Sequence, residues 1–303
     1  MFQSFSEPSS PEQGPPRLAT LRKEMLAAGV DGFIVPRADA HQGEYVAERD
    51  SRLAWLTGFT GSAGYCVALR DKASVFVDGR YRVQVRVQVA DVFTPVDWPE
   101  VTLGDWLTEH VAPNGVVGFD PWLHTVSQIR DLEATTPSVT LQRTENLVDR
   151  IWEDQPDPPA SHAFVQPVDL AGEAHKDKIA RLATALGPAR CAVLTLPDSI
   201  CWLLNIRGDD LPRTPFMLGF ALLHANGTVT LFVNPEKLAH LGGHLGPDHK
   251  RRRIEDAYGE SPPPPAFLEA PMWPNVVARG LPSYRTMCSP NRFGKPSGNT
   301  WAS

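Results

Sequence analysis

The cluster most typical of a metal site in this 303-residue chain is formed by His240, His244 and His249. His240 and His244 are four residues apart, so a helix would present both imidazoles on one face, where a zinc ion could bind. The zinc-protease pattern also requires a glutamate directly after the first histidine, and Leu241 occupies that position. Two glycines follow and weaken the helix. The pattern therefore favours solvent-facing histidines over a metal site.

Two adjacent carboxylates, Asp209 and Asp210, are the candidates for general acid–base chemistry. Neighbouring side chains in an extended loop diverge, so the pair favours turn formation or a salt link with Arg207 or Arg213. Ser62 lacks the Gly-x-Ser-x-Gly spacing that presents a hydrolase nucleophile. The residue types and their spacing therefore indicate no catalytic group.

Composition limits the class of protein. The net charge of −6 argues against a nucleic-acid surface, and no apolar run reaches the roughly 18 residues of a membrane helix. The N-terminus lacks the apolar core of a secretory signal. The 4 cysteines form no Cys-x-x-Cys pair, which is typical of reduced cysteines in the cytoplasm. We expect a cytoplasmic protein that binds neither nucleic acid nor membrane.

The most specific stretch of the chain is Ser51–Gly64, with the sequence SRLAWLTGFTGSAG. Gly58, Gly61 and Gly64 recur every three residues, and glycine permits a positive φ and close approach of two backbones. No Lys-Ser/Thr pair follows, and the spacing differs from that of a dinucleotide-binding loop. The stretch therefore predicts a sharp bend between a helix and a buried strand at 65–69.

Strands and helices alternate along the chain, which predicts α/β layers. We expect strands at 31–36, 65–69, 74–81, 115–120, 190–196, 216–224 and 228–233, and helices at 18–28, 101–110, 125–135, 172–186, 198–204 and from 236 to 242. Residues 82–89 alternate between valine and polar side chains, and this period by itself indicates a strand.

Two domains are expected because residues 153–163 are proline-rich and acidic, as in a stiff linker. The linker separates a first domain at 17–152 from a second, possibly incomplete, domain at 164–249. Residues 1–16 are rich in serine and proline and are expected to be a disordered lead. The basic residues 250–253 are expected to be a solvated charge run. They open a proline-rich tail at 250–303 that we expect to be disordered.

Four stretches together resemble the Xaa-Pro aminopeptidase (aminopeptidase P) family in its three-domain form. They are Ser51–Gly64, FVDGRY at 76–81, GFDPW at 118–122 and ICWLLNIRGDD at 200–210. The resemblance extends from about residue 17 to about residue 248. It implies an α/β fold of two successive creatinase N-terminal-type domains, each a mixed sheet flanked by helices. It also implies a helix directly after 78–81, and we therefore expect a helix at 82–89 despite the alternation.

In that family a C-terminal third domain carries out the chemistry. It binds two divalent metals, typically manganese, through two Asp, one His and two Glu. The metal pair generates a hydroxide that attacks the bond between an N-terminal residue and proline. The resemblance stops near residue 250, and none of the five ligands can be placed in this chain. We therefore expect no catalytic residue, metal or other cofactor here. A truncated or frameshifted gene product would explain the abrupt change.

Two functions are compatible with these observations. The first is the N-terminal, non-catalytic portion of a metal-dependent Xaa-Pro aminopeptidase, which is inactive alone. This portion would form a homodimer through its first domain. It would encounter a peptide substrate only when a catalytic domain is present. Trp55, Arg80, Tyr81 and Arg207 are then candidates for inter-domain or cleft contacts. The second is a non-catalytic module for peptide binding, protein binding or dimerisation. A creatinase-type amidinohydrolase is disfavoured, because the glycine-rich bend and residues 205–209 resemble the peptidase branch.

Overall fold

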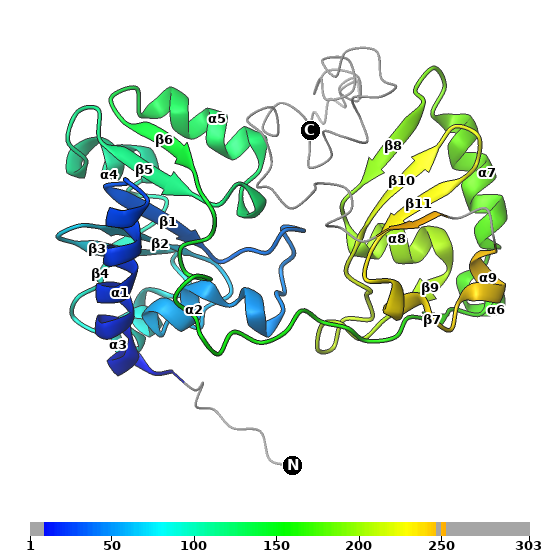
Figure 1. The fold of residues 1–303 in the computed structure, drawn as a ribbon, viewed down its shortest axis with the longest axis horizontal. Helices are drawn as coiled ribbons and strands as arrows, with labels where there is room; N and C mark the ends of the chain where they lie inside the picture. Colours follow the sequence, from blue (N-terminus) through cyan, green and yellow to red (C-terminus); the bar gives the residue numbers. More distant parts are fainter. Residues whose placement is uncertain (1–8, 247–249, 253–303) are drawn as a thin grey trace, which may run out of the picture.

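The computed structural model describes residues 9–246 and 250–252 of the chain (Figure 1). These residues form two α/β units, which we name domain 1 (residues 9–152) and domain 2 (residues 164–246 and 250–252). An extended linker joins them. The expected α/β class with mixed sheets is confirmed. His249 and the expected tail beyond residue 252 lie outside the described residues.

Domain 1 is built on a six-stranded mixed sheet with the order β4-β3-β2-β1-β5-β6. Its strands are β1 (Gly32–Pro36), β2 (Tyr65–Leu69), β3 (Ala73–Val77), β4 (Thr94–Asp97), β5 (Val116–Phe119) and β6 (Thr140–Arg143). Strand β2 is antiparallel to β1 and β3, and the other pairs are parallel. Sequence reasoning missed β4 and β6, because these short edge strands lack the apolar run of a central strand.

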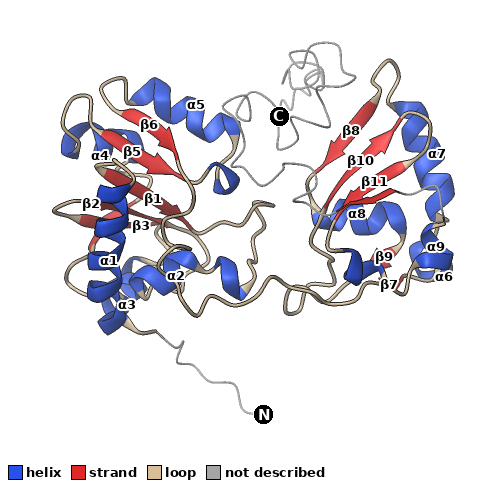
Figure 2. Ribbon diagram, in the orientation of Figure 1, coloured by secondary structure: helices blue, strands red, loops and turns tan. Residues whose placement is uncertain are grey.

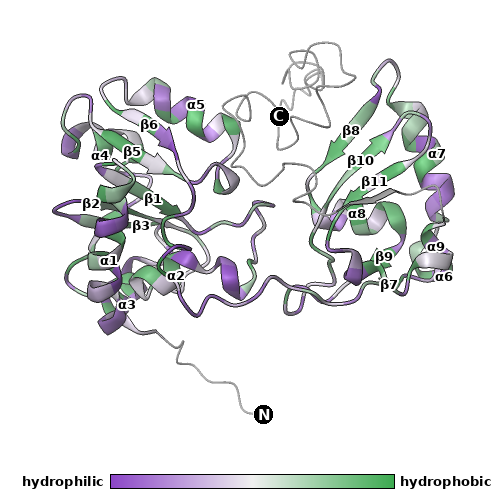
Figure 3. Cartoon of the chain, in the orientation of Figure 1, coloured by the Kyte–Doolittle hydropathy of each residue, from purple (hydrophilic) through white to green (hydrophobic). Residues whose placement is uncertain are grey.

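Helices cover both faces of this sheet (Figure 2). They are α1 (Gly14–Ala27), α2 (Arg52–Thr57), α3 (Arg82–Gln88), α4 (Leu103–His110) and α5 (Val126–Thr135). Successive strand side chains point to opposite faces, so Phe33 and Val35 pack in one core cluster and Ile34 in the other. The first cluster includes residues of α1, α2 and α3, and the second includes residues of α4 and α5. In Figure 3 the central strand β1 is mainly apolar, whereas the edge strand β6 and much of the linker are polar.

The helix expected from the resemblance at 82–89 is confirmed as α3, and the strand indicated by period alone is wrong. The helix buries Val85, whereas Val83 and Val87 are 82% and 75% exposed. Gln88 is buried as well, and its Oε1 accepts a hydrogen bond from the Thr60 backbone N–H at 3.0 Å. A polar contact and one valine therefore hold this helix, so its apolar pattern carries no helical period.

The expected disorder of residues 1–16 is wrong for the part that the structure describes. Residues 11–13 form the 3₁₀ helix η1, and α1 then begins at Gly14, four residues before the expected start. Pro15 and Pro16 fall in the first turn, where a helix does not need their missing N–H groups. Gly14 is buried, and a Cβ placed there would lie 2.7 Å from the Phe93 ring. Residues 1–8 lie outside the described residues.

The glycine-rich bend is confirmed. Helix α2 ends at Gly58, whose φ of +87° is left-handed, and a Cβ there would clash with the Gln88 carbonyl oxygen. Gly64 has a φ of +149°, and its Cβ would lie 2.6 Å from the Phe76 carbonyl oxygen. Both positions need glycine because two backbone segments come close at a positive φ. The bend turns the chain from α2 into β2.

Domain 2 is smaller and has a four-stranded sheet with the order β12-β11-β10-β8. The strands of this sheet are β8 (Cys191–Leu194), β10 (Phe220–His224), β11 (Val229–Phe232) and β12 (Lys250–Arg252). Two short strands, β7 (Phe164–Val165) and β9 (Ile206–Arg207), form a separate pair. The α-helices are α6 (Val168–Ala171), α7 (His175–Ala185), α8 (Pro197–Leu204) and α9 (Gly242–Leu245). Helices α7 and α8 contribute to a core cluster with β10 and β11.

Two expectations for the end of domain 2 are wrong. Residues 250–252 form strand β12, parallel to β11, so disorder does not describe them. The helix expected from 236 to 242 is replaced by the 3₁₀ helix η4 (Pro235–Leu238) and the short α9. Pro235 fits the first turn of η4, and the glycines that begin α9 have poor helix propensity. No helix in the described residues has the length and apolarity to cross a bilayer.

Candidate functional site

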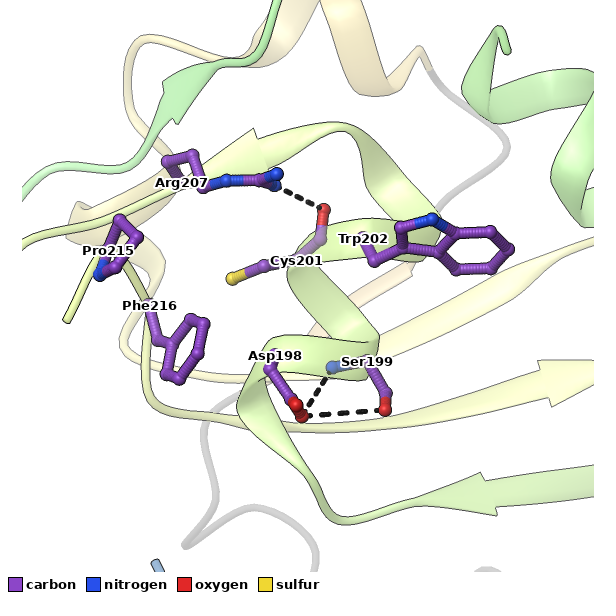
Figure 4. A pocket seen from close by; sticks show the side chains of 7 residues that line it. All are labelled: Asp198, Ser199, Cys201, Trp202, Arg207, Pro215 and Phe216. Carbon is purple, nitrogen blue, oxygen red and sulfur yellow. Dashed lines mark hydrogen bonds between the residues drawn. The ribbon is translucent and has the colours of Figure 1, made fainter. Parts of the chain in front are cut away.

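A pocket of about 440 Å³ lies beside α8 in domain 2 (Figure 4). This volume lies within the roughly 300–1,000 Å³ of typical small-ligand pockets. Its walls come from α8, β9 and the segment before β10, through Asp198, Ser199, Cys201, Trp202, Arg207, Pro215 and Phe216. Figure 4 shows the Cys201 side chain pointing toward Phe216, with Arg207 above them, while the Trp202 ring extends away from these side chains.

Helix α8 positions most of this wall. Its core side buries Ile200, Leu203 and Leu204, so the opposite side presents Trp202, which is 43% exposed. The helix ends at Asn205, whose left-handed backbone turns the chain into β9 and brings Arg207 over the pocket.

Lys178 of α7 fixes the end of α8. Its Nζ donates to the Asn205 Oδ1 at 2.7 Å and to the Trp202 carbonyl oxygen at 3.0 Å. The same ammonium lies 4.3 Å from the centre of the Trp202 ring, within the range of a cation–π interaction. The orientation of Trp202 in the pocket wall is therefore set from inside domain 2.

The pocket has opposite charges and apolar surface between them. The Arg207 guanidinium donates to the carbonyl oxygens of Ile206 at 2.8 Å and Cys201 at 3.4 Å, and among the described residues it forms no ion pair. The Asp198 carboxylate accepts from the Ser199 backbone N–H at 2.7 Å. With Phe216 between them, these groups suit a ligand that combines a carboxylate, an N–H or ammonium group and an apolar part.

The thiol in the pocket wall is not a nucleophile. Cys201 is buried, and burial raises its pKa to about 11, so the neutral thiol dominates near pH 7. Its sulfur accepts a hydrogen bond from the Met217 backbone N–H at 3.3 Å. Cys201 therefore supports the loop before β10.

The histidines considered for metal binding have separate neighbours. His240 is exposed and contacts the His162 ring, with centroids 4.7 Å apart. His244 contacts the His175 ring at 4.3 Å, and its Nε2 donates to the Leu204 carbonyl oxygen at 2.8 Å. Solvent exposure is thus confirmed for His240 and wrong for His244, which is half-buried. Within residues 9–246 and 250–252, no three His, Cys, Asp or Glu side chains group as metal ligands, so these residues do not fit a two-metal centre.

The carboxylate pair divides into one buried and one exposed member. Asp210 accepts hydrogen bonds from the Lys237 Nζ at 2.6 Å, the Leu218 backbone N–H at 2.6 Å and the Ser161 hydroxyl at 2.7 Å. Asp209 is exposed. The expected salt link with Arg207 or Arg213 is wrong, because Lys237 on η4 supplies the cation from 27 residues away in the chain.

Three of the four predicted contact residues lie in domain 1, away from the pocket. Trp55 packs inside this domain, with its ring 5.1 Å from the Trp152 ring and 4.3 Å from the Arg17 guanidinium carbon. Arg80 is exposed and pairs with Asp78 at 2.7 Å. Its guanidinium also lies 5.1 Å from the centre of the next ring in the chain, that of Tyr81.

Tyr81 connects this surface to the glycine-rich bend. Its hydroxyl shares a hydrogen bond of 2.6 Å with Ser62, and its ring meets Phe59 edge-on at 5.6 Å. The structure thus brings Arg80 and Tyr81 together, and it places Arg207 alone of the four in the pocket wall. A role for these residues in contacts with a further domain stays a prediction.

Sequence reasoning missed Asp198, Trp202 and Phe216 as pocket residues. The signal available was the position of Trp202 on α8, where it follows Asp198 by four residues on the side opposite the core. No local pattern shows that Phe216 meets this helix, because a loop of irregular backbone brings it there. Arg213 in that loop has a φ of +63°.

The described residues form two successive α/β domains, each built on a mixed sheet. Residues 17–151 and residues 154–261 each match a family model described as the Creatinase/Prolidase N-terminal domain. The chain belongs to this family and contains two such domains in succession.

The full-length relatives of the chain are Xaa-Pro aminopeptidases, which confirms the resemblance. A probable Xaa-Pro aminopeptidase P of Ajellomyces capsulatus (strain H143) is 35% identical over 245 residues, covering 76% of this chain and 38% of the relative. The corresponding protein of Aspergillus oryzae (strain RIB 40) is 36% identical over 260 residues, covering 81% and 39%. The chain therefore spans about two fifths of the length of these relatives.

A solved structure gives the same result for the fold. The X-prolyl aminopeptidase of Caenorhabditis elegans, described as a cytosolic enzyme with a di-nuclear active site, superposes with a TM-score of 0.73 and 28% identity. The match covers 81% of this chain and 43% of the nematode enzyme. Domain 1 and domain 2 thus correspond to less than half of an enzyme of this type.

Proposed function

We propose that the chain is the N-terminal, non-catalytic portion of a metal-dependent Xaa-Pro aminopeptidase, which releases an N-terminal residue that precedes proline. The observation that carries this proposal is the match of both domains, in succession, to relatives that are Xaa-Pro aminopeptidases and are about two and a half times longer than the matched part. The di-nuclear site of the nematode enzyme supports a two-metal reaction for the longer protein.

In this proposal the two domains position and restrict peptide access to a catalytic domain outside the described residues. Arg80 and Tyr81 form a polar surface on domain 1, and Arg207 lies in a pocket wall on domain 2. These three residues are the proposed contacts with the catalytic part. Domain 1 would also form a homodimer, and the cytosolic nematode enzyme supports a cytoplasmic location.

The test is peptide hydrolysis by the purified chain with added manganese. An Xaa-Pro-Xaa tripeptide should remain intact, while the C. elegans enzyme, as a positive control, cleaves it under the same conditions. A circular dichroism spectrum of folded α/β protein is required for the same preparation. Manganese-dependent release of the N-terminal residue by the chain itself would refute the non-catalytic assignment.

The pocket beside α8 favours a second candidate function, a non-catalytic module that binds peptides. Arg207 and Asp198 offer opposite charges to the two ends of a short peptide, and Trp202 and Phe216 offer apolar contacts. Calorimetry with the tripeptide should then show binding without turnover.

A matched pair of variants tests the pocket directly. Arg207→Ala should weaken binding at least tenfold, since a hydrogen bond to a charged group contributes about 1.5–3 kcal/mol and each 1.4 kcal/mol is about tenfold in affinity. Arg190→Ala removes the same charge from an exposed position outside the pocket and should leave binding unchanged. Equal effects of the two variants, or no heat of binding with the wild-type chain, would exclude this function.

A further inference from the structure

Helix α3 carries two exposed valines on adjacent turns of one face. Val83 and Val87 are 82% and 75% exposed, and their spacing of four residues places them next to each other on the helix surface. A single exposed apolar side chain needs no explanation, but valine is a poor helix former and gains no burial at these two positions. Val92, in the turn that follows the helix, is also exposed. Nothing in the described residues covers this apolar surface.

The position of α3 leaves this surface accessible to another molecule. The helix connects β3 to β4, which is the last strand of the domain 1 sheet, and it lies on the side of domain 1 away from domain 2 (Figure 1). Arg82 holds it to the end of β4 through ion pairs with Asp97, at 3.5 Å, and with Glu100. Pro95 of β4 has no backbone N–H, so this strand is a poor template for a further strand. Association at this edge of domain 1 would therefore use the helix face.

Two charges of opposite sign accompany the valines. Arg86 lies on α3 directly before Val87 and is exposed, and Asp91 lies in the turn after the helix and is exposed as well. Across residues 9–246 and 250–252, neither side chain takes part in an ion pair, in contrast to Arg82 at the start of the same helix. The surface therefore combines apolar side chains with one unpaired cation and one unpaired anion.

Such a surface is complementary to itself. A two-fold axis beside Val87 would place the valines of one copy against those of a second copy, as in an isologous interface. The Arg86 guanidinium of each copy would then reach the Asp91 carboxylate of the other, because these residues are little more than one helical turn apart and arginine has a long side chain. Both charges would thus find partners that one chain does not provide. A partner surface with charge of a single sign would leave either Arg86 or Asp91 unpaired.

We infer that the α3 face, formed by Val83, Arg86, Val87, Asp91 and Val92, is the surface through which two copies of this chain associate. The inference rests on the homodimer included in the proposed function, for which it supplies the residues, and it does not depend on the peptidase reaction. A few residues on each side bury less than the roughly 800 Å² per partner that is usual for a stable interface. The dimer should therefore be weak and should dissociate on dilution.

The test measures the molar mass of the chain by analytical ultracentrifugation at concentrations from about 1 μM to about 1 mM, a range that brackets a weak dissociation constant. The wild-type chain should shift from monomer to dimer across this range. Val87→Glu places a charge at the centre of the contact in both copies, so it should raise the dissociation constant at least about tenfold. Val168→Glu changes an exposed valine of α6 in domain 2 and should associate as the wild type does. Circular dichroism confirms the fold of each variant.

A charge exchange tests whether the partner is a second copy. Arg86→Glu alone and Asp91→Arg alone should each be more weakly dimeric than the wild type, because like charges then face each other across the two-fold axis. An equimolar mixture of the two variants should associate again, since the mixed dimer has an opposite charge at both contacts. Both residues are exposed, so neither substitution should prevent folding.

Three results would overturn the inference. A wild-type chain that stays monomeric at every concentration would show that the α3 face does not bind a second copy, while the aminopeptidase assignment would still depend on the hydrolysis test. A dimer that Val87→Glu does not weaken would show that the copies meet at another surface. A mixture of Arg86→Glu and Asp91→Arg that associates no better than either variant alone would contradict the reciprocal pairing.

Discussion

The buried carboxylate of Asp210 provides the sharpest test of how domain 2 is held together. Its side chain is 0% exposed, and the Lys237 side chain that pairs with it at 2.6 Å is 6% exposed. In Asp210→Ala the ammonium stays buried without its carboxylate, and the Leu218 backbone N–H and the Ser161 hydroxyl lose their acceptor.

The expected cost is about 3–5 kcal/mol, the usual effect of removing one partner of a buried ion pair. This is a large share of the roughly 5–15 kcal/mol that stabilises a typical domain. Urea denaturation followed by circular dichroism measures the loss in the free energy of unfolding. The double variant Asp210→Asn with Lys237→Met removes both charges and should recover part of the stability, because the desolvation cost of the ammonium disappears with it.

Asp209→Ala is the matched control for this prediction. Asp209 is the neighbouring carboxylate and is exposed, so its removal should change the free energy of unfolding by less than about 0.5 kcal/mol. A loss below 1 kcal/mol for Asp210→Ala would show that the pair is not the structural centre that its geometry indicates. Equal losses for the two variants would contradict the same reasoning.

Three further predictions concern domain 1. Gly58→Ala should lower the melting temperature in a thermal scan more than Gly172→Ala, because both glycines have a positive φ but only Gly58 also lacks room for a Cβ. His124 should show no change of its NMR imidazole signals from pH 8 to pH 6, since its pKa is lowered to about 4, and the stability it contributes should be lost as the pH falls from about 6.5 toward 4. Arg52→Lys should destabilise the chain in urea by about 1–3 kcal/mol, because lysine cannot reproduce the two bonds of 2.6 and 2.9 Å from Arg52 to Asp149.

Sequence patterns located most central elements of the fold because burial on both faces leaves a clear signal. Strands β1, β2 and β5 are apolar runs, and each lies within the range expected for it. Edge strands such as β4 and β6 carry one buried face at most, so their four residues look like loop.

Helix α3 shows why periodicity failed at one place and the family resemblance succeeded. Its alternating valines have the period of a strand, but two of them face solvent and a buried glutamine holds the helix to the glycine-rich bend. The motif at Ser51–Gly64 includes Thr60, which makes this polar contact with Gln88, whereas a hydrophobic period gives no information about a polar contact. The same bend positions Ser62 against Tyr81, next to Arg80. The two motifs at 51–64 and 76–81 therefore contain the residues that form this surface.

The candidate site was less predictable because its parts come together through tertiary contacts. Arg207 was identified from its motif, but Phe216 reaches the pocket through an irregular loop, and Lys237 reaches Asp210 across 27 residues. Neither contact has a local period or spacing that a sequence could display. Both contacts form only when the chain folds and brings distant residues together.

Asp210 also links the pocket to the boundary between the domains. Its carboxylate accepts hydrogen bonds from Ser161, at the end of the linker, and from the backbone N–H of Leu218, two residues before β10. The same loop continues from Arg207 and ends at Phe216 in the pocket wall. A substitution at Asp210 should therefore also weaken peptide binding, because the Asp210 backbone N–H donates to the Phe216 carbonyl oxygen at 3.3 Å and its carboxylate fixes the segment that leads into β10. An unchanged calorimetric affinity for the tripeptide in a folded Asp210→Ala chain would show that the pocket does not depend on this carboxylate.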